Sequence, residues 1–139
     1  MTMKPISYAV ALAAAAACWA QPAAAAGRFD GSAALVCSAL VVHECGLGEM
    51  CLPRAAHSVS LPALMRVDAK AKKITSLDAG AKRESMAVSA TNVDGKLVMH
   101  GGEAGRGWAI TVHEQNGRLS GAVVTDGEGY VLFGQCAVP

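Results

Sequence analysis

Cysteine is the residue type with the richest chemistry in this chain, and four of its five cysteines follow residue 36. Cys37, Cys45, Cys51 and Cys136 form an even set whose thiols can pair as disulfides, bind a metal or supply a nucleophile. Four cysteines allow three pairings. We expect Cys45 to pair with Cys51 around a flexible glycine-containing stretch. We expect Cys37 to pair with Cys136 and to join the first strand to the last.

A metal site is one alternative for this region, because Cys37, His43, Cys45 and Cys51 lie close together in the sequence. The segment lacks the C-x₂-C pairs that are usual in zinc modules, and an oxidising compartment favours disulfides. Another alternative makes Cys45 a nucleophile with His43-Glu44 as its base, but oxidation to a disulfide would disable that thiol. We therefore expect neither a metal site nor a catalytic residue here.

The histidines suggest a third chemistry, a soft copper site. His100 and His113 are predicted near the ends of neighbouring strands. Met65, Met86 and Met99 could add thioether ligands. His100 and Met99 are consecutive residues of one predicted strand, however, so their side chains point to opposite faces. The sequence predicts solvated histidines and no cofactor, and a copper-binding or other metal-binding protein stays as a lesser alternative.

Trp108 and Arg106 are the candidate contact residues for a ligand or a partner. Trp108 opens a predicted strand and alternates with Ile110 and Val112, so its ring belongs to the apolar face. There it either anchors the core or lines the mouth of a barrel cavity, where Arg106 would meet a polar group of a small ligand. The chain has no G-x-S-x-G, H-E-x-x-H, P-loop or Rossmann motif, and we expect no enzyme.

The elements that must position these residues are predicted to be short β-strands joined by tight turns. Asn116-Gly117 and Asp94-Gly95 are dipeptides that favour two-residue type I′ hairpins. The alternation of apolar and polar residues predicts strands over 64–68, 73–77, 86–90, 97–99, 108–112, 119–123 and 130–133, and the nearly all-apolar run 35–42 predicts a strand covered on both faces. A helix over 62–73 is the alternative for the lysine-rich segment there.

Seven or eight such strands with short connections predict an all-β fold. It is an antiparallel meander, either closed as a small barrel or folded as a compact sandwich, and held by disulfides. Gly121 and Gly134 fall inside strands, where they predict bends or bulges. The four glycines between residues 101 and 107 predict a flexible loop between two strands. They match no phosphate-binding motif, because no helix follows them.

The first 26 residues have the pattern of a secretory signal peptide. Lys4 precedes an apolar run from Tyr8 to Ala17, and small residues end the segment at Ala24-Ala25-Ala26. The run is shorter than the roughly 20 residues that a membrane-spanning helix needs. We therefore expect cleavage after Ala26 and a single secreted domain over residues 27–139, located in the periplasm or outside the cell.

A lipid anchor is the alternative at this end of the chain. Cys18 follows a run of alanines that resembles a bacterial lipoprotein box, although Ala15 stands where such boxes usually have leucine. Membrane attachment is expected only if Cys18 is lipidated. The formal net charge of +1 offers no basic field that would recruit nucleic acid or an anionic membrane.

Several short motifs spread over the chain resemble those of a group of uncharacterised small exported proteobacterial β-proteins. The most specific are the Arg106-x-Trp108 element and the terminal Phe133-Gly134-x-Cys136 element. The other matching positions are Cys37, Glu44-Cys45, Cys51, Leu61-Pro62, Val67-Asp68, Gly101-Gly-Glu-x-Gly105 and Asn116-Gly117-Arg118-Leu119. The resemblance implies a secreted domain with disulfides, and no activity, cofactor or catalytic residue.

Two functions of different class fit these observations best. The leading expectation is a non-catalytic periplasmic binding or accessory protein that acts on another protein or on an envelope component. The alternative is a lipocalin-like carrier of a small apolar ligand. A void behind Trp108 would favour the carrier, and a filled interior beside a large exposed apolar patch would favour the partner-binding protein.

Overall fold

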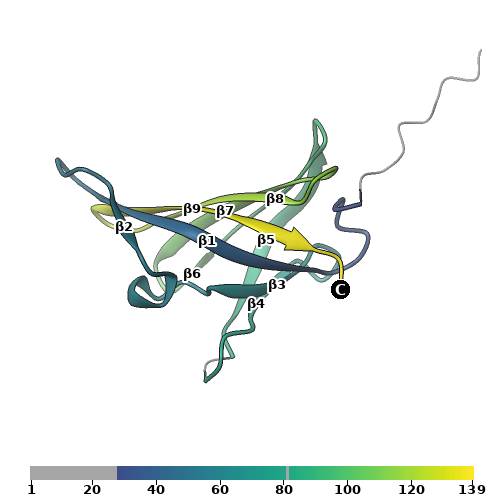
Figure 1. Cartoon of the computed structure of the whole chain (residues 1–139), viewed down its shortest axis with the longest axis horizontal. Helices are drawn as coiled ribbons and strands as arrows, with labels where there is room; N and C mark the ends of the chain where they lie inside the picture. Colours follow the sequence, from purple (N-terminus) through teal and green to yellow (C-terminus); the bar gives the residue numbers. More distant parts are fainter. Residues whose placement is uncertain (1–27, 81) are drawn as a thin grey trace, which may run out of the picture.

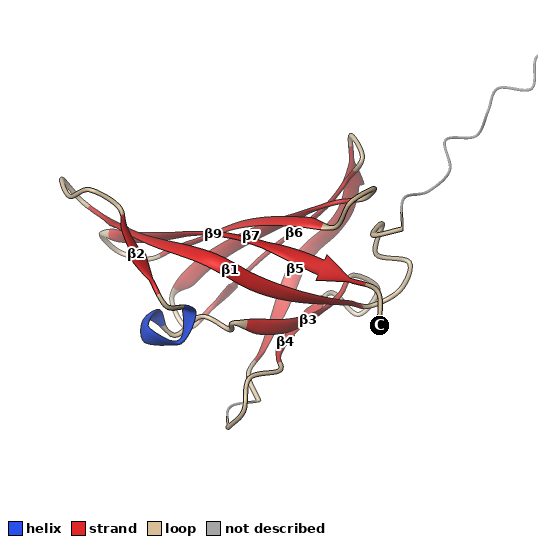
Figure 2. Cartoon of the chain, in the orientation of Figure 1, coloured by secondary structure: helices blue, strands red, loops and turns tan. Residues whose placement is uncertain are grey.

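Nine β-strands and one short 3₁₀ helix make up residues 28–80 and 82–139, the part of the chain that the computed structural model describes (Figure 2). They are β1 (Leu35–Gly46), β2 (Leu52–Arg54), η1 (Ala56–Val59), β3 (Leu64–Asp68), β4 (Lys73–Ser76), β5 (Glu84–Val93), β6 (Lys96–Glu103), β7 (Arg106–His113), β8 (Arg118–Val124) and β9 (Glu128–Ala137). The expected signal peptide, Met1–Ala26, lies outside the described residues.

Eight of these strands close into an antiparallel barrel (Figure 1). The barrel runs in the order β1-β3-β4-β5-β6-β7-β8-β9, and β9 pairs back onto β1. The extra strand β2 continues the same edge of β1 beyond β3, with Val42 opposite Arg54 and Glu44 opposite Leu52. The predicted all-β meander is confirmed, and it closes as a barrel.

The alternative prediction of a helix over residues 62–73 is wrong, because this segment forms β3 and the turn into β4. In β3 Met65 and Val67 are buried and Leu64 and Arg66 are exposed, as the two-residue period of a strand requires, and Ile74 of β4 is buried as well. The period of the burial pattern therefore overrides the helix propensity of the alanines and lysines nearby.

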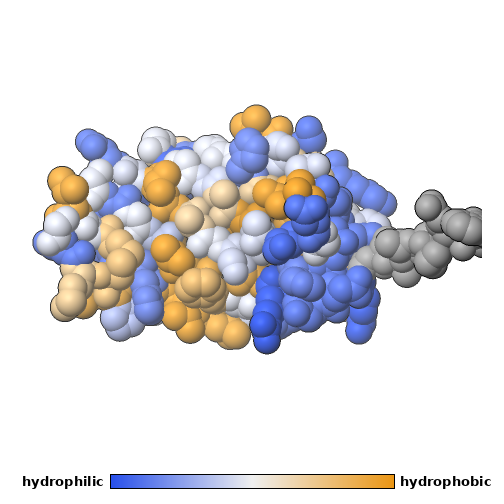
Figure 3. All heavy atoms as spheres, turned by 90° about the horizontal axis from the view of Figure 1, so that it is seen from above, coloured by the Kyte–Doolittle hydropathy of each residue, from blue (hydrophilic) through white to orange (hydrophobic). Residues whose placement is uncertain are grey.

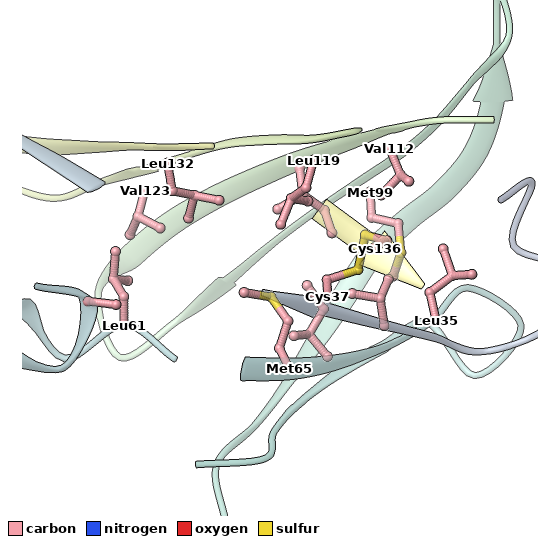
Figure 4. Close-up of a cluster of buried hydrophobic side chains, with 14 of the residues drawn as sticks. Leu35, Cys37, Leu61, Met65, Met99, Val112, Leu119, Val123, Leu132 and Cys136 are labelled. Atoms are coloured by element: carbon pink, nitrogen blue, oxygen red, sulfur yellow. A yellow bond between two sulfur atoms is a disulfide. The ribbon is translucent and has the colours of Figure 1, made fainter. Parts of the chain in front are cut away.

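Both predicted disulfides are present. Cys37 of β1 lies directly opposite Cys136 of β9 and is bonded to it, so the long bridge crosses the seam at which the barrel closes (Figure 4). Cys45 is bonded to Cys51 and folds the chain back from β1 into β2. Two structural disulfides point to an oxidising compartment outside the cytoplasm.

The segment before β1 closes one end of the barrel. Phe29 is buried there, and its backbone N–H donates a hydrogen bond to the carbonyl of Glu114 at 2.9 Å. The Asn92 amide donates to the Asp30 carbonyl at 2.9 Å and to the Glu114 carboxylate at 2.7 Å. These bonds tie the segment to the β5–β6 and β7–β8 ends and leave the opposite end, next to η1, for the site.

The prediction of a glycine-rich loop between residues 101 and 107 is wrong. β6 continues to Glu103 and β7 begins at Arg106, so the connection is the dipeptide Ala104-Gly105 with φ of 49° and 78°. Positive φ at both central residues is typical of a type I′ turn. Gly101 lies inside β6, where a Cβ would stand 2.7 Å from the Trp108 ring.

The two predicted hairpins form with different turns. Asp94-Gly95 has φ of 48° and 73°, as the expected type I′ turn requires. At Asn116-Gly117 the type I′ prediction is wrong, because positive φ occurs at Gly117 and not at Asn116. The Gly117 N–H instead donates to the His113 carbonyl at 2.8 Å, which makes a longer connection.

The two glycines predicted inside strands serve different purposes. Gly134 allows β9 to approach β1, because a Cβ there would stand 1.8 Å from the Ser38 carbonyl oxygen, and β1 has a bulge between Ala39 and Val41 at that point. Gly121 marks no bulge, since the register of β8 is regular on both sides. Its missing side chain leaves room for Ile110, 3.0 Å from an ideal Cβ.

Candidate ligand-binding site

An apolar cavity of about 80 Å³ lies inside the barrel at the end next to η1. Its lining includes Leu61, Ile74, Trp108, Ile110, Val123 and Leu132. Leu61 follows η1 and lies across the interior from Val123 and Leu132 (Figure 4). One water needs about 10–15 Å³ and drug-sized sites have about 300–1,000 Å³, so this cavity suits a group of a few carbons.

Trp108 forms part of the cavity wall. It is half-buried, packs against the core and lies opposite Gly101 of β6 in the register. Its indole N–H donates a hydrogen bond to the Ser85 hydroxyl of β5 at 2.8 Å. The ring therefore has its single donor satisfied and is held in one orientation beside the cavity.

Arg106 lies two residues before Trp108 and faces the same side of β7. Its guanidinium Cζ is 5.9 Å from the centroid of the Tyr130 ring, within the range of a cation–π contact. Its Nη1 is buried and has no hydrogen-bond partner among residues 28–80 and 82–139. A buried charged donor without a partner is costly, so this nitrogen is an available binding group.

Arg106 also lines a second, polar hollow that is more open than the cavity. Glu44, Arg54 and Tyr130 line this hollow, and Trp108 lines the apolar cavity. The guanidinium group is thus shared by an apolar interior and a polar exterior. Such a boundary fits the polar end of an amphiphilic molecule.

The carboxylates around this boundary already have partners. Glu103, which pairs with Arg106 in the β6–β7 register, accepts a hydrogen bond from Arg83 Nε at 2.6 Å. Glu44 forms an ion pair with Arg54. Neither acid forms an ion pair with Arg106 within the described chain. Arg83 also donates to the Ser60 carbonyl at 2.8 Å, which links the segment after η1 to the strand β5.

Tyr130 is the buried phenol of the site. Its hydroxyl donates a hydrogen bond to the Glu128 carboxylate at 2.9 Å. This bond, followed by burial and by the charges of Glu128 and Glu44, raises the pKa of Tyr130 above its ordinary value of 10.0. The phenol is therefore neutral at pH 7, and Arg106 faces an uncharged ring.

The residues considered for metal or acid–base chemistry are not assembled into one site. Met99 is buried and His100 is exposed, as the strand alternation predicts. His100 pairs in register with Ala109 and not with His113. Cys45 is oxidised in its disulfide. Across residues 28–80 and 82–139, no group of three or more histidine, cysteine or acidic side chains could hold a metal.

Sequence reasoning identified Arg106 and Trp108, and the strand period explains why. It did not identify Arg83, Ser85 and Tyr130, or Leu61 in the cavity lining next to η1. Ser85 is the second residue of β5 and Arg83 stands just before that strand, so both precede the predicted 86–90 strand and their positions depend on the β4–β5 pairing. The alternation of Tyr130 with Leu132 was a usable signal for the phenol.

Comparison with protein-family models, with curated proteins and with solved structures finds no match to this chain. The functional interpretation of the site therefore depends on its geometry alone. No helix within the described ranges has both the length and the apolar character needed to cross a membrane.

Proposed function

We propose that this chain is a secreted, non-catalytic β-barrel protein that binds a small apolar ligand, or the apolar end of a larger one, beside Trp108. The observation that carries the proposal is the apolar cavity at the η1 end of the barrel. Eight-stranded barrels have interiors just wide enough to be filled by side chains or to hold one small ligand. Protein interiors are otherwise packed with few voids larger than a water molecule.

Tryptophan fluorescence tests this proposal directly. Trp108 and Trp19 are the two tryptophans of the chain, so Trp19→Phe makes Trp108 the single reporter. Titration with hexan-1-ol, a neutral apolar probe, should change the Trp108 emission in a saturable way. Val123→Phe should abolish this response, because Val123 lines the cavity and the larger ring would fill it.

Val124→Phe is the matched control, since Val124 is the next residue of β8 and is exposed on the outer face. It should leave the saturable response within about twofold of the parent protein, as surface changes do. A response that survives Val123→Phe, or none in the parent protein, would contradict binding in the cavity.

We further propose that the protein is exported to the periplasm through cleavage after Ala26. The small-residue ending of the first 26 residues supports this, together with the two disulfides. The intact mass of the exported protein should correspond to a chain that begins at Gly27 and carries no acyl group. A diacylated N-terminus at Cys18 would instead make it a membrane-anchored lipoprotein.

A second candidate function is docking to a protein or an envelope component through the outer face of β1 and β9. Leu40 is 70% exposed and Phe133 is 50% exposed, and Val41 lies opposite Phe133 in the register. Figure 3 shows apolar side chains gathered over the middle of one face of the molecule. Exposed apolar groups that cluster in this way are typical of interaction sites.

Crosslinking in intact cells distinguishes this candidate from ligand carriage. Phe133→Asp should abolish a specific crosslinked product if this face docks a partner, while Val123→Phe should leave it unchanged. The same product from the wild type and from Phe133→Asp would exclude docking through this face.

A further inference from the structure

We infer that the ligand of this cavity is a small amphiphilic monoanion, a short-chain carboxylate whose apolar tail enters the cavity and whose carboxylate binds Arg106. This inference rests on the proposed function and names the chemical class of its ligand. It is carried by the buried guanidinium nitrogen at the cavity wall.

Arg106 provides a donor that the rest of the described chain does not use. Its Nη1 is buried and lacks a hydrogen-bond partner there. A guanidinium group presents several donors in a planar fork that matches the two oxygens of a carboxylate. The Tyr130 ring contacts this group through its face, with its centroid 5.9 Å from the guanidinium Cζ, and the Tyr130 hydroxyl hydrogen-bonds Glu128.

The acids nearby are held by other residues. Glu103 binds Arg83, and Glu44 binds Arg54. A carboxylate that arrives from outside would therefore add to these pairs and would break none of them. Without that partner, the buried Nη1 of Arg106 is desolvated at the edge of an apolar space with no hydrogen bond to compensate it.

The charge of the site favours a monoanion over a dianion. Arg54, Arg83 and Arg106 supply three positive charges, and Glu44, Glu103 and Glu128 supply three negative charges at neutral pH. A carboxylate leaves this group with one excess negative charge. A phosphate monoester would leave nearly two, among acids that repel it.

The position of Arg106 also matches an amphiphile. The residue lines both the apolar cavity and the open polar hollow, so a head group can bind it without entering the apolar space. Only a few carbons fit in about 80 Å³. The matched probes are hexanoate, hexan-1-ol and hexyl phosphate, which share one tail and differ in the head group.

Trp108 fluorescence of the Trp19→Phe protein at pH 7 measures the three affinities. Hexanoate is ionised at this pH and should bind at least tenfold more tightly than hexan-1-ol, the range expected for hydrogen bonds to a charged group. Hexyl phosphate should bind more weakly than hexanoate. Arg106→Met should reduce the preference for hexanoate over hexan-1-ol to within about twofold.

Arg118→Met is the matched control, because Arg118 is exposed at the far end of the barrel, where β8 begins. It should retain the full preference for hexanoate. If hexan-1-ol binds in the cavity and hexanoate binds no better, recognition of the anion is overturned and the proposed function stands. If none of the three probes binds, both are overturned. If Arg106→Met does not fold, the affinities of the parent protein for hexanoate and for hexan-1-ol still decide the inference.

Discussion

Arg106 and Trp108 lie two positions apart on β7 and share its inner face, yet their polar atoms differ in what they contact. The Trp108 N–H donates to Ser85, whereas the Nη1 of Arg106 is buried without a partner in the described chain. Natural proteins retain such unfavourable groups where function requires them. The contrast supports Arg106 as the proposed binding group, beside a Trp108 ring held in one orientation.

Arg106→Met should stabilise the protein in the absence of ligand. The change removes a buried, unpaired donor and keeps an unbranched apolar side chain, so we expect the free energy of unfolding to rise by about 1 kcal/mol. Urea unfolding followed by Trp108 fluorescence measures it. A loss of more than 1 kcal/mol would mean that Arg106 holds the fold together, and its role as a free binding group would be wrong.

Gly101→Ala should destabilise the barrel and disturb the Trp108 ring. An added Cβ would stand 2.4 Å from the Met86 carbonyl oxygen and 2.7 Å from the ring. We expect a loss of about 1–3 kcal/mol, the usual range for overpacking, with a shift of the Trp108 emission maximum. Gly102→Ala is the control, because its nearest neighbour would be 3.4 Å away. Equal stability of the two variants would contradict this packing.

Tyr130 should ionise above pH 10. Its raised pKa stabilises the folded state fully below the pKa of about 10 of the unfolded chain, and this contribution is lost as pH rises through the folded-state pKa. Absorbance titration near 295 nm of a Tyr8→Phe protein isolates the Tyr130 phenol, since the chain has two tyrosines. A midpoint at or below 10 would show that the Glu128 hydrogen bond is absent in solution.

At the scale of elements, the seam between β1 and β9 is the place where the barrel could open. Ten residue pairs join the two strands, and the Cys37–Cys136 disulfide crosslinks them with a sequence separation of 99. The Cys45–Cys51 bridge, with a separation of 6, orders only the turn into β2. The two bridges therefore constrain very different lengths of unfolded chain.

Removal of the bridges should cost unequal amounts of stability. The pair Cys37→Ala with Cys136→Ala should lower the free energy of unfolding by about 4–5 kcal/mol, and the pair Cys45→Ala with Cys51→Ala by about 2 kcal/mol. Denaturant titration of both double variants measures the difference. An equal or reversed order would contradict the assignment of the long bridge as the main covalent support of the barrel.

Most of the strands could be predicted from the sequence, because one face of each is buried and the apolar residues alternate. β3 has the predicted bounds, and the other predicted strands were mostly extended by a few residues. β2 could not be predicted, since its three exposed residues carry no burial pattern and it forms only because the Cys45–Cys51 bridge folds the chain back. Gly101 was mistaken for part of a loop, because the need for a glycine there comes from the Trp108 ring on the neighbouring strand.

The candidate site was less predictable than the fold. Arg106 and Trp108 could be named from the period of one strand. The contacts around the unpaired Nη1 of Arg106 involve Glu103 of β6, Tyr130 of β9 and Arg83, which stands just before β5. Those contacts depend on the register of the whole barrel, which no local pattern specifies.

At the scale of the whole molecule, the two ends of the barrel differ. Phe29 and the segment before β1 close one end with hydrogen bonds to the backbone, and the other end holds the cavity, whose lining includes Leu61. The walls between them are made of strands whose inner side chains form a continuous apolar core. A barrel closed at one end and hollow at the other is suited to hold a small molecule.

The central claim is that a small apolar group binds inside the barrel, and methyl NMR tests it most directly. Hexan-1-ol titrated into the methyl-labelled protein should shift the resonances of Ile74, Ile110 and Val123, which line the cavity. Those of Val88 and Val93, exposed on the outer face of β5, should stay in place. Shifts confined to outer methyls, or no saturable shift of the cavity methyls, would contradict the account.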